Sequence, residues 1–165
     1  MTVLVEAADV AAWFMEAHPA PERLEAEWHE RPYWTAQLPV GRAWSAVAMP
    51  ADLGAEVVSI LDVMLGEWQA PVLVDRLHQR YYFFTEPDLV GVAESGDVWN
   101  LSRRTWLTVP HPIHGPYDCR TVWRRPPWRE GALLSVADLA NAIRLAGPAH
   151  HYRRDAAGPG TRSAR

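Results

Sequence analysis

The sequence predicts an α+β protein in which helices pack on a mainly antiparallel sheet. Short apolar or aromatic runs that are typical of strands recur between residues 43 and 125, and turn residues separate them. Residues 53–64 and 136–145 instead repeat apolar side chains every three or four positions, which indicates amphipathic helices. A chain of 165 residues is long enough to bury one core, so we expect a single folded unit.

Residues 1–42 are predicted to form a helical and aromatic extension that precedes the core. Leu4 to Ala17 has the apolar spacing of an amphipathic helix. Pro21 to Glu30 is predicted to be a short acidic helix, and an extended arm follows it up to Leu38. The aromatic side chains of this arm are expected to pack onto the body of the protein rather than to bind a ligand.

The core is predicted to span residues 43–147 and to start with a buried strand from Ala43 to Met49. A helix follows this strand, with its apolar side chains on one face, and ends at Gly66. Val72 to Val74 and Arg80 to Thr85 are rich in β-branched and aromatic residues. The polar segment between these two runs therefore predicts a β-hairpin.

Val98 to Trp128 is the stretch with the most unusual chemistry. It holds two histidines three residues apart, the single cysteine, several arginines and four tryptophans. Thr105 to Val109 and Thr121 to Arg124 are predicted strands, and the segment between them is too rich in Pro and Gly to be helical. Because loops held between strands often carry binding groups, we expect the functional site here.

A final helix is predicted from Val136 to Leu145, with Gly147 and Pro148 as its stop. Residues 148–165 are basic and rich in Gly, Ala and Ser. This composition predicts a disordered tail.

Charge is distributed unevenly along the chain. All 16 basic residues are arginines, and the formal net charge is −4. Residues 1–75 carry 3 Arg against 12 acidic residues, whereas residues 76–165 carry 13 Arg against 8 acidic residues. The second half can therefore present a surface that attracts anions, although ordinary solvated charge accounts for the same distribution.

Composition also argues against several classes of protein. No apolar run approaches eighteen residues and no basic-then-apolar leader is visible, so neither a membrane span nor a secretory signal is expected. A single cysteine excludes an internal disulfide and fits a reducing compartment, so we expect a cytoplasmic protein. Gly-rich phosphate loops of the P-loop and dinucleotide-binding kinds are absent. The cofactor and the oligomeric state stay open.

Four features follow one another between residues 43 and 146. They are a buried strand running into a helix with Leu53-Gly54 near its start, Pro71 before a strand with Arg80-Tyr81-Tyr82-Phe83, a strand ending in Pro110-His111-Pro112-Ile113-His114, and Gly115, Tyr117, Trp123 and Pro126 before a final helix. In this order they resemble the bacterial and plasmid primase–polymerase (prim-pol) domain of the archaeo-eukaryotic primase superfamily. The resemblance implies a prim-pol-like core.

The resemblance also argues against polymerase activity. Active prim-pol domains hold two divalent metals with an acidic D-x-D pair at the end of the first strand and with a third acid. Residues 46–49 (AVAM) stand in place of the pair, the residues nearest to the third acid are Asn100 and Asp97, and Arg80 replaces a histidine. Without oxygen ligands a two-metal site cannot form, so the chain is predicted to be a catalytically lapsed relative.

Arginine and aromatic residues of this region are the candidate ligand-binding groups. They are Arg76, Arg80, Arg103, Arg104, Tyr82 and Trp106. The arginines are expected to hold a phosphate through bidentate hydrogen bonds, and the aromatic rings offer stacking faces for a base. We therefore expect the protein to bind a nucleotide or a single-stranded nucleic acid, or a protein partner through its many tryptophans.

A different class of function, a small-molecule enzyme, is the alternative. His111 and His114 are candidate metal ligands if Pro112 bends the chain, since residues three apart on a strand otherwise point to opposite faces. His114, Tyr117 and Cys119 are candidate catalytic residues for acid–base or thiol chemistry. A polar loop without activity is the simpler explanation of the same residues.

Overall fold

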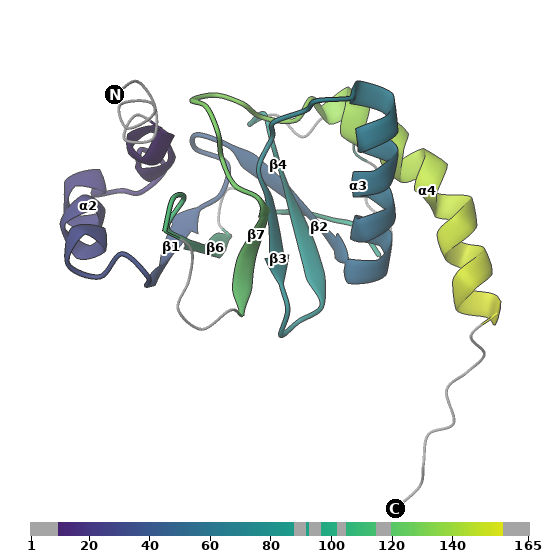
Figure 1. Ribbon diagram of the computed structural model, residues 1–165, viewed down its shortest axis with the longest axis horizontal. Helices are drawn as coiled ribbons and strands as arrows, with labels where there is room; N and C mark the ends of the chain where they lie inside the picture. The colour runs from purple at the N-terminus through teal and green to yellow at the C-terminus, as the bar shows by residue number, and fades with distance from the viewer. Residues whose placement is uncertain (1–9, 88–91, 93–96, 102–104, 115–119, 157–165) are drawn as a thin grey trace, which may run out of the picture.

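The computed structural model describes residues 10–87, 92, 97–101, 105–114 and 120–156. Residues 10–15 are helical. The elements after them are α2 (Pro21–Glu30), β1 (Thr35–Pro39), β2 (Ser45–Pro50), α3 (Ala51–Leu65), β3 (Val72–Asp75), β4 (Arg80–Thr85), β5 (Trp99–Leu101), β6 (Trp106–Pro110), β7 (Thr121–Arg125) and α4 (Val136–Ala156). Helices and antiparallel strands share one fold (Figure 1), so the predicted α+β class is confirmed.

The described strands form two antiparallel sheets. The larger has five strands in the order β5-β2-β4-β3-β7, and the smaller is a ribbon of β1 and β6. The predicted hairpin is confirmed as β3 and β4. The two strands predicted around residues 105 and 121 also form, but β6 pairs with β1 and β7 pairs with β3.

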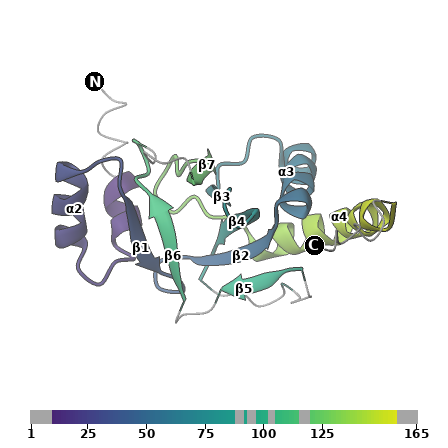
Figure 2. The same cartoon turned by 90° about the horizontal axis from the view of Figure 1, so that it is seen from below.

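The five-stranded sheet is buried on both faces, because side chains alternate between two separate cores. Val47 and Met49 of β2 pack with α3 and α4 on one face. Ala46 and Ala48 face the other core, which contains the ribbon and the N-terminal segment. Figures 1 and 2 show the two helices on one side of the sheet and the ribbon with α2 on the other.

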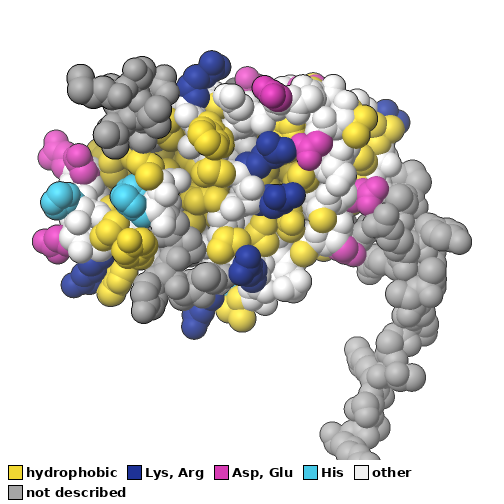
Figure 3. All heavy atoms as spheres, in the orientation of Figure 1, with side chains coloured by type: hydrophobic (Ala, Val, Ile, Leu, Met, Phe, Trp, Pro, Cys, Tyr) yellow, Lys and Arg dark blue, Asp and Glu magenta, His cyan; other side chains and the backbone are white. Residues whose placement is uncertain are grey.

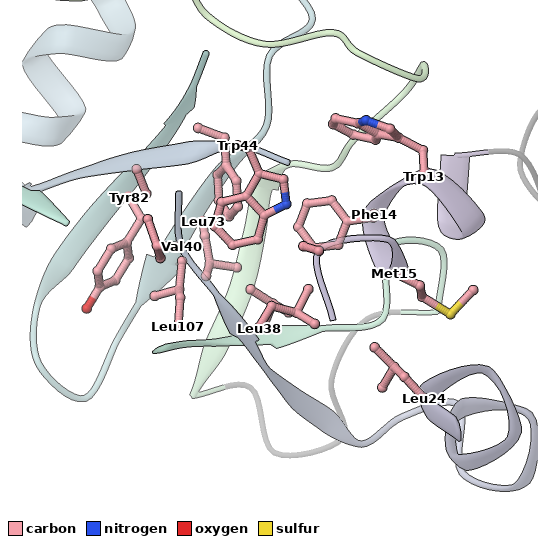
Figure 4. Packing of buried hydrophobic residues seen from close by; sticks show 14 of the residues in the cluster. Trp13, Phe14, Met15, Leu24, Leu38, Val40, Trp44, Leu73, Tyr82 and Leu107 are labelled. Carbon is pink, nitrogen blue, oxygen red and sulfur yellow. The ribbon is translucent and has the colours of Figure 1, made fainter. Parts of the chain in front are cut away.

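The N-terminal segment contributes its own aromatic side chains to the second core. The ring of Phe14 stacks on Trp44 with centroids 5.4 Å apart (Figure 4). It also contacts Phe84 and Trp123. Phe14 and Trp44 are fully buried. This packing joins the helical residues 10–15 to the sheet and fixes where α2 and β1 lie.

Glycine sets the position of α3 on the sheet. A Cβ at residue 54 would lie 2.5 Å from the Cβ of Tyr81 on β4, so the helix can approach the strand this closely only with glycine there. The helix ends where the sequence predicts, at Gly66, whose φ of 66° favours glycine.

The last helix differs from its prediction. α4 continues from Val136 to Ala156, so the predicted end at Gly147-Pro148 is wrong, and residues 148–156 are helical rather than disordered. Gly147 does not take the positive φ of a helix cap, and the chain therefore passes through it in a helical course. Residues 157–165 lie outside the described part. Among the helices that the structure describes, none is long and apolar enough to cross a membrane.

Candidate functional site

Three arginines meet at the end of the sheet where β3 turns into β4. Arg76 and Arg80 belong to this hairpin, and the backbone N–H of Arg76 donates to the carbonyl of Arg120 at 2.7 Å. Asp75 lies opposite Arg80 on one side and opposite Thr121, the first residue of β7, on the other. All three arginines are exposed, and we call this region the arginine end. Figure 3 shows arginine side chains along the β7 side of the molecule.

Among the described residues of β3, β4 and the turn between them, Asp75 carries the one carboxylate, and it is already engaged. Its Oδ1 accepts from the backbone N–H of His78 at 3.0 Å, and its Oδ2 lies 2.7 Å from the His78 ring. Burial alone raises the pKa of Asp75, but the hydrogen bonds and the charge of His78 outweigh burial and hold the pKa below its ordinary value. Residues 72–85 of the arginine end therefore carry two arginines against one ionised carboxylate that His78 already partners.

Arg80 is held by two aromatic residues. Its guanidinium lies 4.7 Å from the centroid of the Trp99 ring, and Arg80 also interacts with the side chain of Tyr82, whose pKa it lowers. Trp99 on β5 and Tyr82 on β4 flank Ala48 of β2, and this small residue lets the indole reach across to the arginine. Burial and the charge of Asp75 raise the pKa of Tyr82, while Arg80 lowers it. The net effect is a raised pKa, so the hydroxyl is neutral at pH 7, as it already is at the ordinary tyrosine pKa.

The structure brings together only part of the predicted ligand-binding set. Arg80 and Tyr82 are in contact, as just described, and Arg76 lies in the same turn. Trp106, which is 50% exposed, lies instead at the start of β6 in the ribbon, opposite Pro39. Arg103 and Arg104 lie outside the described residues. Trp99 and Arg120 were missed, because only the sheet order places them near Arg80.

Residues 46–49, which stand where prim-pol domains carry their acidic pair, are apolar and buried. Residues 46–49 are all buried, two against each core. Asn100, the nearest match to the third acid, donates through Nδ2 to the carbonyl of Val92 at 3.1 Å. Within the described part of the chain, no group of three or more His, Cys, Asp or Glu residues could hold a metal ion.

The two predicted metal ligands do converge. Residues 112–114 form a turn, and it brings the rings of His111 and His114 to 4.7 Å between centroids. They line a cavity of about 330 Å³ together with Trp28 and His29 of α2. The condition that the sequence sets, a bend at Pro112, is therefore met.

Hydrogen bonding fixes the tautomer of His111. Its Nδ1 accepts from the backbone N–H groups of Ile113 and His114, at 3.1 and 3.2 Å. Burial, with a smaller effect of the charge of His114, lowers the pKa of His111 to about 4. The ring is therefore neutral at pH 7 and carries its proton on Nε2. In this state neither ring nitrogen offers a free lone pair to a metal.

Two of the three candidate catalytic residues, Tyr117 and Cys119, lie outside the described residues. His114 is exposed, and its ring centroid lies 6.2 Å from that of Tyr33. Metal binding and acid–base chemistry at this cavity therefore stay predictions.

A second cluster of charge and aromatic residues lies where β7 passes the end of α3. Arg125 forms an ion pair with Asp62, and its guanidinium lies 4.3 Å from the centroid of the Trp68 ring. The indole N–H of Trp68 donates to the same carboxylate at 2.7 Å. These residues and the exposed Trp128 line an open cavity of about 470 Å³. Because the charges of Arg125 and Asp62 neutralise each other, we interpret the cluster as a structural contact between β7 and the end of α3.

Comparison with models of protein families, with curated protein sequences and with solved structures finds no match to this chain. The resemblance to the prim-pol domain therefore rests on the sequence motifs alone. The function has to be argued from the described geometry.

Proposed function

We propose that the protein is a non-catalytic binding protein that takes the phosphate of a nucleotide or of a single-stranded nucleic acid at the arginine end. One observation carries the proposal. Arg76 and Arg80 of the β3–β4 hairpin and Arg120, which precedes β7, lie at the same end of the sheet beside Asp75, whose carboxylate His78 already holds. Arginine is well suited to phosphate because its planar fork donates two parallel hydrogen bonds.

Trp99 supports the proposal by positioning Arg80. An exposed arginine normally loses side-chain freedom when it binds, and the stacking on an indole reduces that loss in advance. The partly exposed Trp99 ring also offers a surface on which a base can stack beside the phosphate. A phosphate with an attached base therefore fits this site better than an isolated phosphate ion.

The buried strand β2 supports binding rather than nucleotidyl transfer. Residues 46–49 provide no oxygen ligand near a phosphate at the arginine end. Phosphoryl transfer by two metals needs such ligands to place the attacking and leaving oxygens. We therefore expect a ligand to be held and released unchanged.

The test is fluorescence anisotropy with a labelled single-stranded oligonucleotide, followed by competition with a nucleoside triphosphate. Arg80→Ala is expected to weaken binding about tenfold, since charge-assisted hydrogen bonds contribute about 1.5–3 kcal/mol and an exposed site receives the lower part of that range. Higher salt is expected to weaken binding by the wild-type protein more than by Arg80→Ala.

Arg23→Ala is the matched control. Arg23 is also exposed and its removal changes the net charge equally, but it lies on α2 and pairs with Glu27 at 3.0 Å. The control is expected to bind like the wild type. Equal weakening by both variants would indicate a general charge effect, and no weakening by Arg80→Ala would refute the site.

A further inference from the structure

A groove runs between α2 and the outer edge of β1. Within the described strands, β1 pairs with β6 on one side only. Figure 2 shows α2, β1 and β6 in that order across the molecule, so the unpaired edge faces α2. The groove has a volume of about 360 Å³. It is lined by Leu24, Glu27, Trp28, Glu30, Arg31, Trp34, Thr35 and Ala36.

The backbone along this edge is ready to pair with another strand. The N–H of Val40 donates to the carbonyl of Thr105 at 2.9 Å, so the residues of β1 that face β6 are the alternate ones, Leu38 and Ala36. Thr35 and Gln37 therefore direct their N–H and C=O groups towards the groove. No hydrogen bond of these groups to any other described residue occurs. Such an edge is a template for a strand from another chain.

The floor of the groove is apolar, and a hydrogen bond between Trp28 and Trp34 holds α2 against the start of β1. Leu24 and Trp28 of α2 are almost fully buried, and the indole N–H of Trp28 donates to the carbonyl of Trp34 at 3.0 Å. Trp34 itself is 59% exposed, and the guanidinium of Arg31 lies 4.4 Å from its ring centroid. An extended peptide in the groove would place alternate side chains against this floor.

Charge indicates the kind of peptide. Glu27 and Glu30 lie along the groove; Glu27 pairs with Arg23 at 3.0 Å, and Arg31, the cation among the lining residues, is stacked on Trp34. Residues 21–31, which form α2 and the residue after it, carry four Glu against two Arg, so this side of the groove has a net negative charge. These carboxylates repel nucleic acid and favour lysine or arginine in the ligand.

We infer that this groove binds an extended, basic peptide segment of a partner protein, which adds to β1 as a third strand of the ribbon. Backbone hydrogen bonds to Thr35 and Gln37 supply affinity, and the apolar floor with the two glutamates supplies selectivity. The site is separate from the arginine end, because it lies on the ribbon and α2 rather than on the β3–β4 hairpin. It therefore does not depend on phosphate binding.

The test begins with a phage-displayed library of random eight-residue peptides selected on the full chain. Enriched sequences are expected to alternate apolar residues with Arg or Lys. The most enriched peptide is then measured by fluorescence polarisation against Gln37→Pro, which removes one N–H from the free edge and leaves the bonds to β6 intact. Loss of one backbone hydrogen bond is expected to weaken the affinity about fivefold.

Thr108→Pro is the matched control, because Thr108 is opposite Gln37 and its N–H points away from β1 on the other side of the ribbon. It is expected to leave the affinity unchanged. Glu30→Arg, an exposed change that does not depend on the strand, is expected to weaken the basic peptide as well.

Enrichment of acidic peptides, no enrichment, or equal affinity for the wild type and Gln37→Pro would overturn the inference. Arg80→Ala is expected to bind the peptide like the wild type. Peptide binding and phosphate binding are therefore tested by different variants, so that either site can be refuted without the other.

Discussion

Protonation of His111 should destabilise the fold in a defined pH range. The pKa of His111 is lowered to about 4 in the folded protein, against about 6.5 in an unfolded chain. As the pH falls, the unfolded chain therefore binds the proton first. Stability is full above pH 6.5 and is lost progressively towards pH 4. Between pH 7 and pH 4.5 we expect this one residue to remove about 2 kcal/mol from the free energy of unfolding.

His111→Asn isolates the titration. The Asn carboxamide oxygen can take the place of Nδ1 and accept from the N–H groups of Ile113 and His114, but it does not titrate. His111→Phe fills the space without an acceptor, which costs about 1–3 kcal/mol at every pH because two backbone donors lose their partner. Both variants should be less dependent on pH than the wild type, by about 2 kcal/mol over this range.

The assay is urea unfolding of the wild type and both variants, followed by tryptophan fluorescence, at pH 7 and at pH 4.5. For each protein, the free energy of unfolding at pH 4.5 is subtracted from that at pH 7. A loss of packing that is the same at both pH values cancels in this difference. If both variants lose as much free energy of unfolding between pH 7 and pH 4.5 as the wild type, His111 is not the group that titrates. Its assignment as a neutral ring that accepts hydrogen bonds through Nδ1 would then be wrong.

Three further predictions concern the stability of the fold. Gly54→Ala should lower the free energy of unfolding by about 1–3 kcal/mol in chemical denaturation, despite a better helix propensity, because its Cβ overlaps Tyr81; an unchanged value would show that α3 can shift. Phe14→Ala should cost about 3–5 kcal/mol if the N-terminal segment shares the core of the sheet, and a single, lowered thermal transition checks this. Asp62→Asn should cost about 0.5–1.5 kcal/mol, because its partly exposed partners Arg125 and Trp68 are left with a weaker, uncharged acceptor, and a thermal midpoint equal to that of the wild type would contradict the role of this contact in stability.

Local periodicity was enough to predict most of the elements. Residues of β2 and β4 are apolar on both faces, as is typical of a central strand, and α3 repeats its apolar residues every three or four positions. The bounds of α2 were also predicted. The pairing of β1 with β6 could not be predicted, because its partners are far apart in the sequence and neither strand carries a local cue for the other. The predicted end of the last helix at Gly147-Pro148 was wrong, because this one dipeptide does not end a helix that continues to Ala156.

The candidate site also has a part that the sequence predicted and a part that depends on how the strands pair. Arg80 and Tyr82 were predicted from the resemblance of residues 80–83 to a prim-pol motif, and they share a face because they are alternate residues of one strand. Trp99 and Arg120 join them only through the strand order, which residue types do not reveal. The convergence of His111 and His114 depended on whether residue 112 bends the chain, and the sequence could state that condition but not decide it.

The pairing of β1 with β6 also determines when the protein can fold on the ribosome. Residues 40–105 separate the two strands, and at about 5–20 residues per second their synthesis takes roughly 3 to 13 s. During that interval Trp13, Phe14 and Trp44 have been made, but β6 and β7, which complete their core, have not. Loss of the nascent chain to aggregation is therefore expected to depend on the speed of translation up to residue 110, and synonymous slow codons before that point should lower the yield.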